Sequence, residues 1–223
     1  MAFKKFWVMV IFAVMFLLSE NVSAMTFSQP VKIGKIIYPP SADMVIEDST
    51  YTSNPPSGKF QNQNTYAYNT IAGFSNGEDS IYVHHMPKHN VNPRVGDKDI
   101  NKSVPIGYGL YGFTIYQIPN DSATKLYMIR PDEAMAVVLD YTLVGKKADG
   151  TFVKYFSFRD IWNKYVGNNR PNGRIFTENV HCEGDSIIIK YTHYEKNVKK
   201  DIGEIRFKWD DAAQWFGIEH IVY

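Results

Sequence analysis

The chain has 223 residues, a formal net charge of +1 at neutral pH and 44% hydrophobic residues. A chain of this length can bury a substantial core within a single domain. The balanced charge lacks the clustered basic excess of proteins that bind nucleic acid or anionic membranes. Cys182 is the only cysteine, so no disulfide can form within the chain. We expect Cys182 to be a small buried hydrophobe on the strand face that carries Val180.

The first 24 residues have the order that is typical of a secretory signal peptide. Two lysines precede an uncharged apolar run at residues 6–18, and small residues follow as far as Ala24. We expect cleavage after Ala24, which leaves residues 25–223 as one domain that is secreted or periplasmic. An uncleaved anchor is the alternative, but the apolar run is short for a permanent membrane span.

Local patterns divide the first three quarters of the chain into strands and loops. Residues 49–65 and 87–105 are polar and irregular, which predicts exposed loops. Residues 131–133 could begin a helical turn, because a proline precedes two acidic residues. Residues 135–144 favour a strand, since a turn at Ala148-Asp149-Gly150 follows them. Further strands are predicted at residues 31–38, 66–74, 81–85, 125–129, 152–156 and 175–182.

A single helix is predicted at residues 158–166. Ser157 can accept a hydrogen bond as its N-cap, and Gly167 is suited to end it. The apolar side chains with helical spacing, which should form one stripe packed on the sheet, are Phe158, Ile161, Trp162 and Tyr165.

The last stretch, residues 186–223, organises the predicted fold as three antiparallel strands. Apolar side chains alternate with polar ones on both sides of a polar turn at residues 196–200, as in half-buried strands. A second turn at residues 210–213 completes the meander. The expected register places these residues opposite each other: Ile189 and Phe207, Tyr191 and Ile205, Phe207 and Phe216, Ile205 and Ile218.

The elements together predict an α+β domain that is mainly antiparallel β-sheet. The sheet should be curved or barrel-like, with the one helix packed on it, and a β-sandwich is the alternative.

Three histidines lie within six residues, at His84, His85 and His89. Neighbouring strand residues point to opposite faces, so at most His85 and His89 could share a metal ion. We expect surface polar residues here and no metal site. Asp97, Asp99 and Asn101 resemble the start of a calcium loop. The later ligand positions do not match that motif, so a solvated turn is expected.

The segment 107–113 combines glycines and tyrosines in an unusual way. Glycine lets a backbone approach a ligand closely, and tyrosine rings offer stacking surface to sugars. We therefore predict a ligand-binding role for Tyr108, Tyr111 and Tyr116. The alternative is a kinked strand that packs its aromatic side chains inward.

The sequence contains none of four common catalytic or binding motifs. These are the G-x-S-x-G nucleophile elbow, the zinc-binding H-E-x-x-H helix, the phosphate-binding P-loop and C-x-x-C. Glu178, Glu183 and Asp185 lie near predicted strand ends and are expected to be ordinary turn residues. The sequence therefore favours a non-catalytic binding module of the cell envelope or exterior, with a glycan or another envelope component as ligand. No cofactor, nucleic acid or permanent membrane anchor is expected. The alternative is a hydrolase that acts on an envelope polymer, with or without the help of a metal ion.

Overall fold

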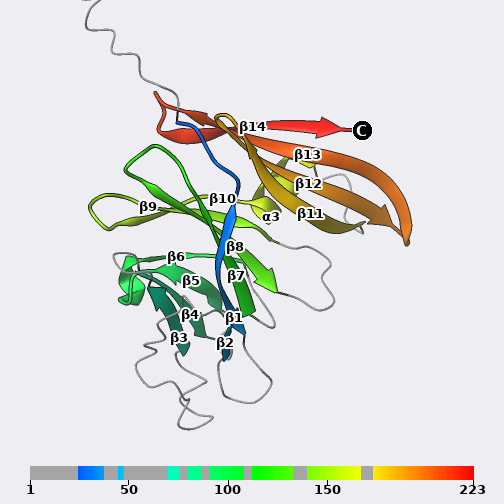
Figure 1. The fold of residues 1–223 in the computed structure, drawn as a ribbon. Helices are drawn as coiled ribbons and strands as arrows, with labels where there is room; N and C mark the ends of the chain where they lie inside the picture. The colour runs from blue at the N-terminus through cyan, green and yellow to red at the C-terminus, as the bar shows by residue number, and fades with distance from the viewer. Residues whose placement is uncertain are drawn as a thin grey trace, which may run out of the picture.

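The computed structural model describes residues 25–37, 45–47, 70–75, 80–86, 91–107, 112–132, 140–166 and 173–223. The strands in these ranges form three antiparallel sheets (Figure 1). The described residues also contain one short α-helix, at Phe158–Ile161. The predicted class, mainly antiparallel α+β, is confirmed, and none of the described sheets closes into a barrel. Among the described residues, no helix is long and apolar enough to cross a membrane.

The six-stranded central sheet has the order β10-β9-β8-β7-β1-β2. Its strands, in chain order, are β1 (Val31–Ile37), β2 (Val45–Glu47), β7 (Gly112–Ile118), β8 (Lys125–Asp132), β9 (Thr142–Lys146) and β10 (Phe152–Ser157).

The C-terminal sheet has the order β11-β12-β13-β14 and forms a meander of consecutive hairpins. Its strands are β11 (Gly173–Glu183), β12 (Ser186–Glu195), β13 (Val198–Asp210) and β14 (Trp215–Val222).

The third sheet has the order β3-β4-β5-β6. It contains β3 (Thr70–Ser75), β4 (Ser80–Met86), β5 (Val91–Gly96) and β6 (Ser103–Pro105), with the 3-10 turn η2 (Ile100–Lys102) before β6.

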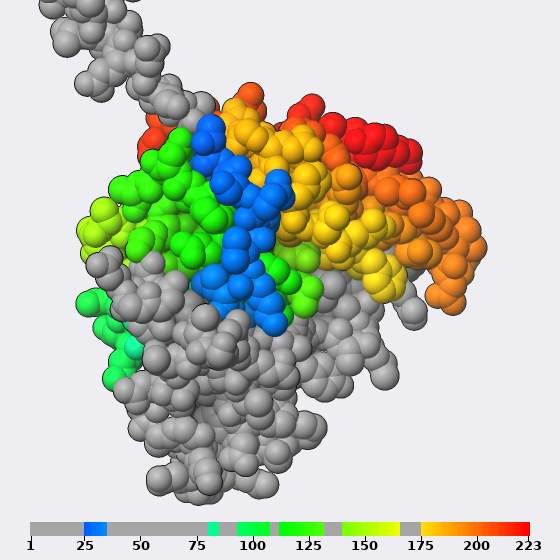
Figure 2. Space-filling view, in the orientation of Figure 1, coloured from blue at the N-terminus to red at the C-terminus, as the bar shows by residue number. Residues whose placement is uncertain are grey.

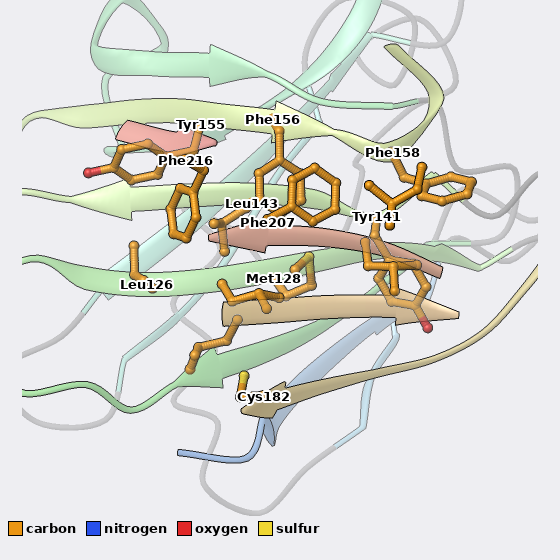
Figure 3. Close-up of a cluster of buried hydrophobic side chains, with 14 of the residues drawn as sticks. Leu126, Met128, Tyr141, Leu143, Tyr155, Phe156, Phe158, Cys182, Phe207 and Phe216 are labelled. Carbon is orange, nitrogen blue, oxygen red and sulfur yellow. The ribbon is translucent and has the colours of Figure 1, made fainter. Parts of the chain in front are cut away.

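The middle of the central sheet is buried on both of its faces. In the apolar run at residues 126–129, Leu126 and Met128 pack into the core shared with the C-terminal sheet. Tyr127 and Ile129 alternate with them and pack into a second core with Ile81 and other residues of the third sheet. Side chains of the first core converge from both sheets in Figure 3. The fold is therefore three layered sheets with two cores, because alternate side chains of one strand point to opposite faces.

The C-terminal meander faces the core as predicted, but its register differs. The first turn consists of Lys196 and Asn197, both with positive φ, and Glu195 lies opposite Val198. A bulge at Lys200 shifts the register by one further residue, so Ile187, not Ile189, lies opposite Phe207. The second turn begins one residue later than predicted, so Phe207 lies opposite Ile218. The other observed pairs are Ile189 with Ile205, Tyr191 with Gly203, Trp209 with Phe216 and Ile205 with His220.

The predicted helix has two parts, the α-helical turn α3 (Phe158–Ile161) and the π-helical turn η3 (Trp162–Val166). The Ser157 hydroxyl accepts a hydrogen bond from the Asp160 amide, as expected for the N-cap. Phe158 and Trp162 are buried, but Tyr165 is 57% exposed, so the stripe prediction is wrong at this residue. A π-helical turn places more residues in each turn than an α-helix, which rotates Tyr165 out of the stripe.

A buried carboxylate stabilises the start of this helix. Asp140 Oδ1 accepts hydrogen bonds from the Ser157 hydroxyl at 2.7 Å and from the Arg159 amide at 2.9 Å. Burial raises the pKa of the Asp140 carboxyl above its ordinary value. Its carboxylate lies so close to Gly107 that a Cβ on this glycine would be 2.3 Å from Asp140 Oδ2. Gly107 is therefore needed for close packing.

Two local predictions are wrong, the loop at residues 87–105 and the helical turn that would begin at Pro131. The predicted loop at residues 49–65 lies outside the described residues. The segment 87–105 contains β5, η2 and β6, whose strand pattern is hidden by Pro93 and Pro105. Proline weakens a strand prediction because it donates no hydrogen bond to the sheet. Pro131 and Asp132 end β8 and do not begin a helical turn. In the segment 135–144, the described strand begins only at Thr142.

The segment before β1 joins the central and C-terminal sheets. The Phe27 amide donates to the Gly184 carbonyl and the Ser28 amide to the Pro119 carbonyl, both at 2.8 Å. The Gln29 side chain donates to the carbonyl of Cys182 and accepts from its amide, so it occupies the edge of β11. In Figure 2 this segment fills the seam between β7 and β8 on one side and β11 on the other.

Candidate functional site

A groove opens at this seam, where the central sheet meets the C-terminal sheet. Its volume is about 210 Å³. We call it the seam groove, and it is lined by Pro30, Tyr116, Arg130, Tyr141, Glu178, Asn179 and Val180.

A second hollow, of about 350 Å³, continues from the same glutamate along the C-terminal sheet. It is lined by Phe176, Glu178, Thr192, Tyr194 and Asn197. The rings of Phe176 and Tyr194 meet edge to face at 5.4 Å. Glu178 lines both hollows, so they are neighbours at the edge of the C-terminal sheet.

A β-bulge presents Glu178 to the two hollows. The register of β11 and β12 shifts between Thr177 and Asn179, which leaves Glu178 as the extra residue. A bulge of this kind changes the direction of side chains that would otherwise alternate. The Thr192 hydroxyl donates a hydrogen bond to Glu178 Oε1, which holds the carboxylate beside the second hollow.

Arg130 and Tyr116 form the wall of the seam groove on the central sheet. The Arg130 guanidinium carbon lies 5.9 Å from the centre of the Tyr116 ring, within the range of a cation–π contact. Arg130 Nη2 also donates to the Thr114 hydroxyl at 3.4 Å. Both side chains are partly exposed. The groove therefore combines an aromatic surface and a cation on one wall with a carboxylate and an amide on the other.

Of the three predicted ligand-binding tyrosines, Tyr116 lines the seam groove. Tyr108 and Tyr111 lie outside the described residues, so their ligand-binding role stays a prediction. The alternative, an aromatic segment packed inward, applies in part to Tyr116, because this half-buried side chain also packs against the core.

The structure describes the three histidines of the predicted group to different extents. His84 is buried and its Nε2 is 2.8 Å from the Asp97 carbonyl oxygen, so the expectation of a surface residue is wrong for His84. Burial lowers the pKa of His84. The backbone of His85 pairs with Thr70 in the sheet. The His85 side chain and all of His89 lie outside the description. Among the described residues, no three metal-ligating side chains form a cluster.

The acidic turn at Asp97 is held by hydrogen bonds within the turn itself. Asp97 Oδ1 accepts from the Asp99 amide at 2.8 Å, and Asp99 Oδ1 accepts from the Asn101 amide at 3.0 Å. These contacts match the solvated turn that the sequence predicts.

Cys182 is buried, as predicted, and burial raises the pKa of its thiol to about 12. The thiol is therefore protonated at neutral pH. It lies in the core between the two sheets (Figure 3).

Sequence reasoning missed Arg130, Tyr141 and Asn179, and it classed Glu178 as an ordinary turn residue. Glu178 instead lies within β11, at the bulge. Glu183 and Asp185 do form surface ion pairs near the strand ends, with Arg206 and Lys208. The polar Glu178-Asn179 pair within a predicted strand was the one available signal, because two adjacent polar residues interrupt the alternation.

Comparisons with protein-family models, curated proteins and solved structures find no significant match to this chain.

Proposed function

We propose that this protein is an exported, non-catalytic binding module of the cell envelope or exterior, and that it binds a glycan in the seam groove. The observation that carries the proposal is the lining of this groove. Tyr116, Arg130, Glu178 and Asn179 bring together an aromatic ring, a cation, a carboxylate and an amide.

This combination suits a sugar chain for two reasons. A sugar ring has an apolar face that stacks on an aromatic ring, and Tyr116 supplies a partly exposed ring at the groove. Sugar hydroxyls both donate and accept hydrogen bonds, and Glu178, Asn179 and Arg130 offer acceptors and donors to them. The second hollow beyond Glu178 gives a longer chain room for a further unit.

A hydrolase that acts on an envelope polymer is the alternative proposal. Most glycoside hydrolases use a pair of carboxylates on either side of the bond that they cleave. Glu178 is the carboxylate that the described lining contributes to both hollows. The binding proposal is the simpler one for a groove with this lining, and product analysis of the bound glycan separates the two.

Tyr116→Ala should weaken glycan binding by about tenfold, which corresponds to about 1.4 kcal/mol of lost stacking and apolar contact. The measurement is a glycan array that identifies a ligand, followed by calorimetric titration. Tyr165→Ala is the matched control, because it removes an exposed tyrosine that lies away from the seam groove. Equal affinities of the Tyr116 variant and the parent chain for every glycan would contradict the proposal. Release of shortened glycan would favour the hydrolase.

The proposed export predicts where the mature protein begins. Expression of the full chain in a bacterium should yield a soluble product that begins at Met25, because the first 24 residues have signal-peptide order. N-terminal sequencing of the exported fraction checks this. A membrane-bound product that retains Lys4 and Lys5 would show that the segment is an anchor.

A further inference from the structure

The charged groups of the seam groove restrict the kind of sugar that fits. Arg130 is the cation of the described lining and Glu178 is its carboxylate. A neutral glycan satisfies Glu178 with hydroxyl donors, but it offers the guanidinium only weak acceptors. A sugar that carries a carboxylate matches both groups, since its hydroxyls donate to Glu178 and its charge pairs with Arg130.

The position of Arg130 favours such a pair. The guanidinium lies against the face of the Tyr116 ring, and one nitrogen is directed to the Thr114 hydroxyl. Thr114 and Arg130 are directly opposite each other in the β7–β8 ladder, so both anchors come from rigid strands. A planar guanidinium that is held in this way can bind a carboxylate with two parallel hydrogen bonds. The Tyr116 ring lies beside the guanidinium, so a sugar that contacts the exposed part of this ring also lies within reach of Arg130.

We propose that the seam groove recognises acidic sugar units, with Arg130 on the sugar carboxylate and Glu178 on its hydroxyls. This inference rests on the proposed glycan-binding function. The shared chemistry is a carboxylate attached to a pyranose, which occurs as the C5 carboxylate of a uronic acid and as the lactyl group of muramic acid.

The experiment compares two acidic probes with neutral counterparts by calorimetric titration. The first pair is galacturonic acid hexasaccharide and its fully methyl-esterified form, which differ only in charge and small ester groups. The second pair is the peptide-free disaccharide of N-acetylglucosamine and N-acetylmuramic acid, and the N-acetylglucosamine dimer. At least one acidic probe should bind about tenfold more tightly than its neutral counterpart, as expected for a charge-assisted hydrogen bond. The pair that shows the preference identifies the source of the carboxylate.

Variants of the two charged residues test the assignment. Arg130→Gln should remove the preference for the acidic probe and leave the affinity for the neutral probe within about twofold. Lys147→Gln, which removes an exposed lysine in the β9–β10 turn, is the matched control and should change neither affinity. Glu178→Gln keeps an acceptor for Thr192 but removes a negative charge, so it should strengthen binding of the acidic probe. This second variant tests the proposal even if Arg130→Gln fails to fold.

The outcomes separate this inference from the function on which it rests. If neutral and acidic probes bind equally and Tyr116→Ala weakens both, the groove binds glycans but the acidic preference is wrong. If the preference survives in Arg130→Gln, or if Glu178→Gln weakens binding of the acidic probe, the assignment of the charged residues is overturned. If none of the four probes binds the parent chain, the acidic-sugar inference is contradicted, whereas a glycan that binds on the array and is weakened by Tyr116→Ala still supports the proposed function.

Discussion

Phe207→Ala should lower the free energy of unfolding by about 3–5 kcal/mol, the usual cost of emptying an aromatic site in a core. The Phe207 side chain has no exposed surface and its ring stacks on Phe156, with ring centres 3.6 Å apart. The two rings come from different sheets, from β13 and β10, and Figure 3 shows them side by side. Removal of one ring therefore weakens the contact between the sheets as well as packing within the C-terminal sheet.

Urea denaturation followed by circular dichroism measures this loss. Ile218→Ala is the matched control, because Ile218 lies directly opposite Phe207 on the neighbouring strand but is 41% exposed. The control should cost about 1 kcal/mol or less, since much of its side chain already contacts water. Equal losses for the two variants would show that the core between the sheets does not carry the stability of the fold.

A chain that ends at Trp209 should lose cooperative thermal melting and aggregate. This truncation removes β14 and with it Phe216, whose ring packs against Phe27, Tyr155 and Trp209. It also removes Asp211, which accepts a hydrogen bond from the Trp209 indole at 2.7 Å. The long strand β13 would then become an unpaired edge, and such edges pair with other chains.

Size-exclusion chromatography and calorimetry of the purified protein check this expectation. A chain that ends at Ile221 is the control, because it removes only Val222 and Tyr223, which are 51% and 75% exposed. The control should melt cooperatively as a soluble protein. A soluble Trp209-terminated chain with a sharp melting transition would show that β14 is dispensable.

The faces of the C-terminal strands were predictable from sequence although their pairing was not. Ile187, Ile189 and Tyr191 all enter the core, as the alternation predicts. The observed register differs from the predicted one by two residues, and a shift of two leaves every side chain on its predicted face. The lengths of the two turns and the bulge at Lys200 together decide the register, and Lys196 and Asn197 adopt left-handed conformations in the first turn.

The groove shows more clearly where sequence reasoning ends. The composition around Tyr116 predicted a ligand-binding segment, and Tyr116 does line the groove. Arg130 and Glu178 come from strands that do not pair with each other, in sheets that are packed together. Hydrophobic periodicity specifies which face of a strand is buried, but it carries no information about which two sheets meet or how they are aligned.

By itself, the sequence determined the mainly antiparallel class, the start of the helix and the buried faces of the C-terminal strands. Each of these depends on neighbouring residues, through periodicity or capping. The tertiary structure decided that Leu126 and Tyr127 face two different cores, that Tyr165 is exposed, and that Glu178 lies across a groove from Arg130. These features depend on contacts between segments far apart in the chain, whose packing is set by the fit of whole sheets and not by local preference.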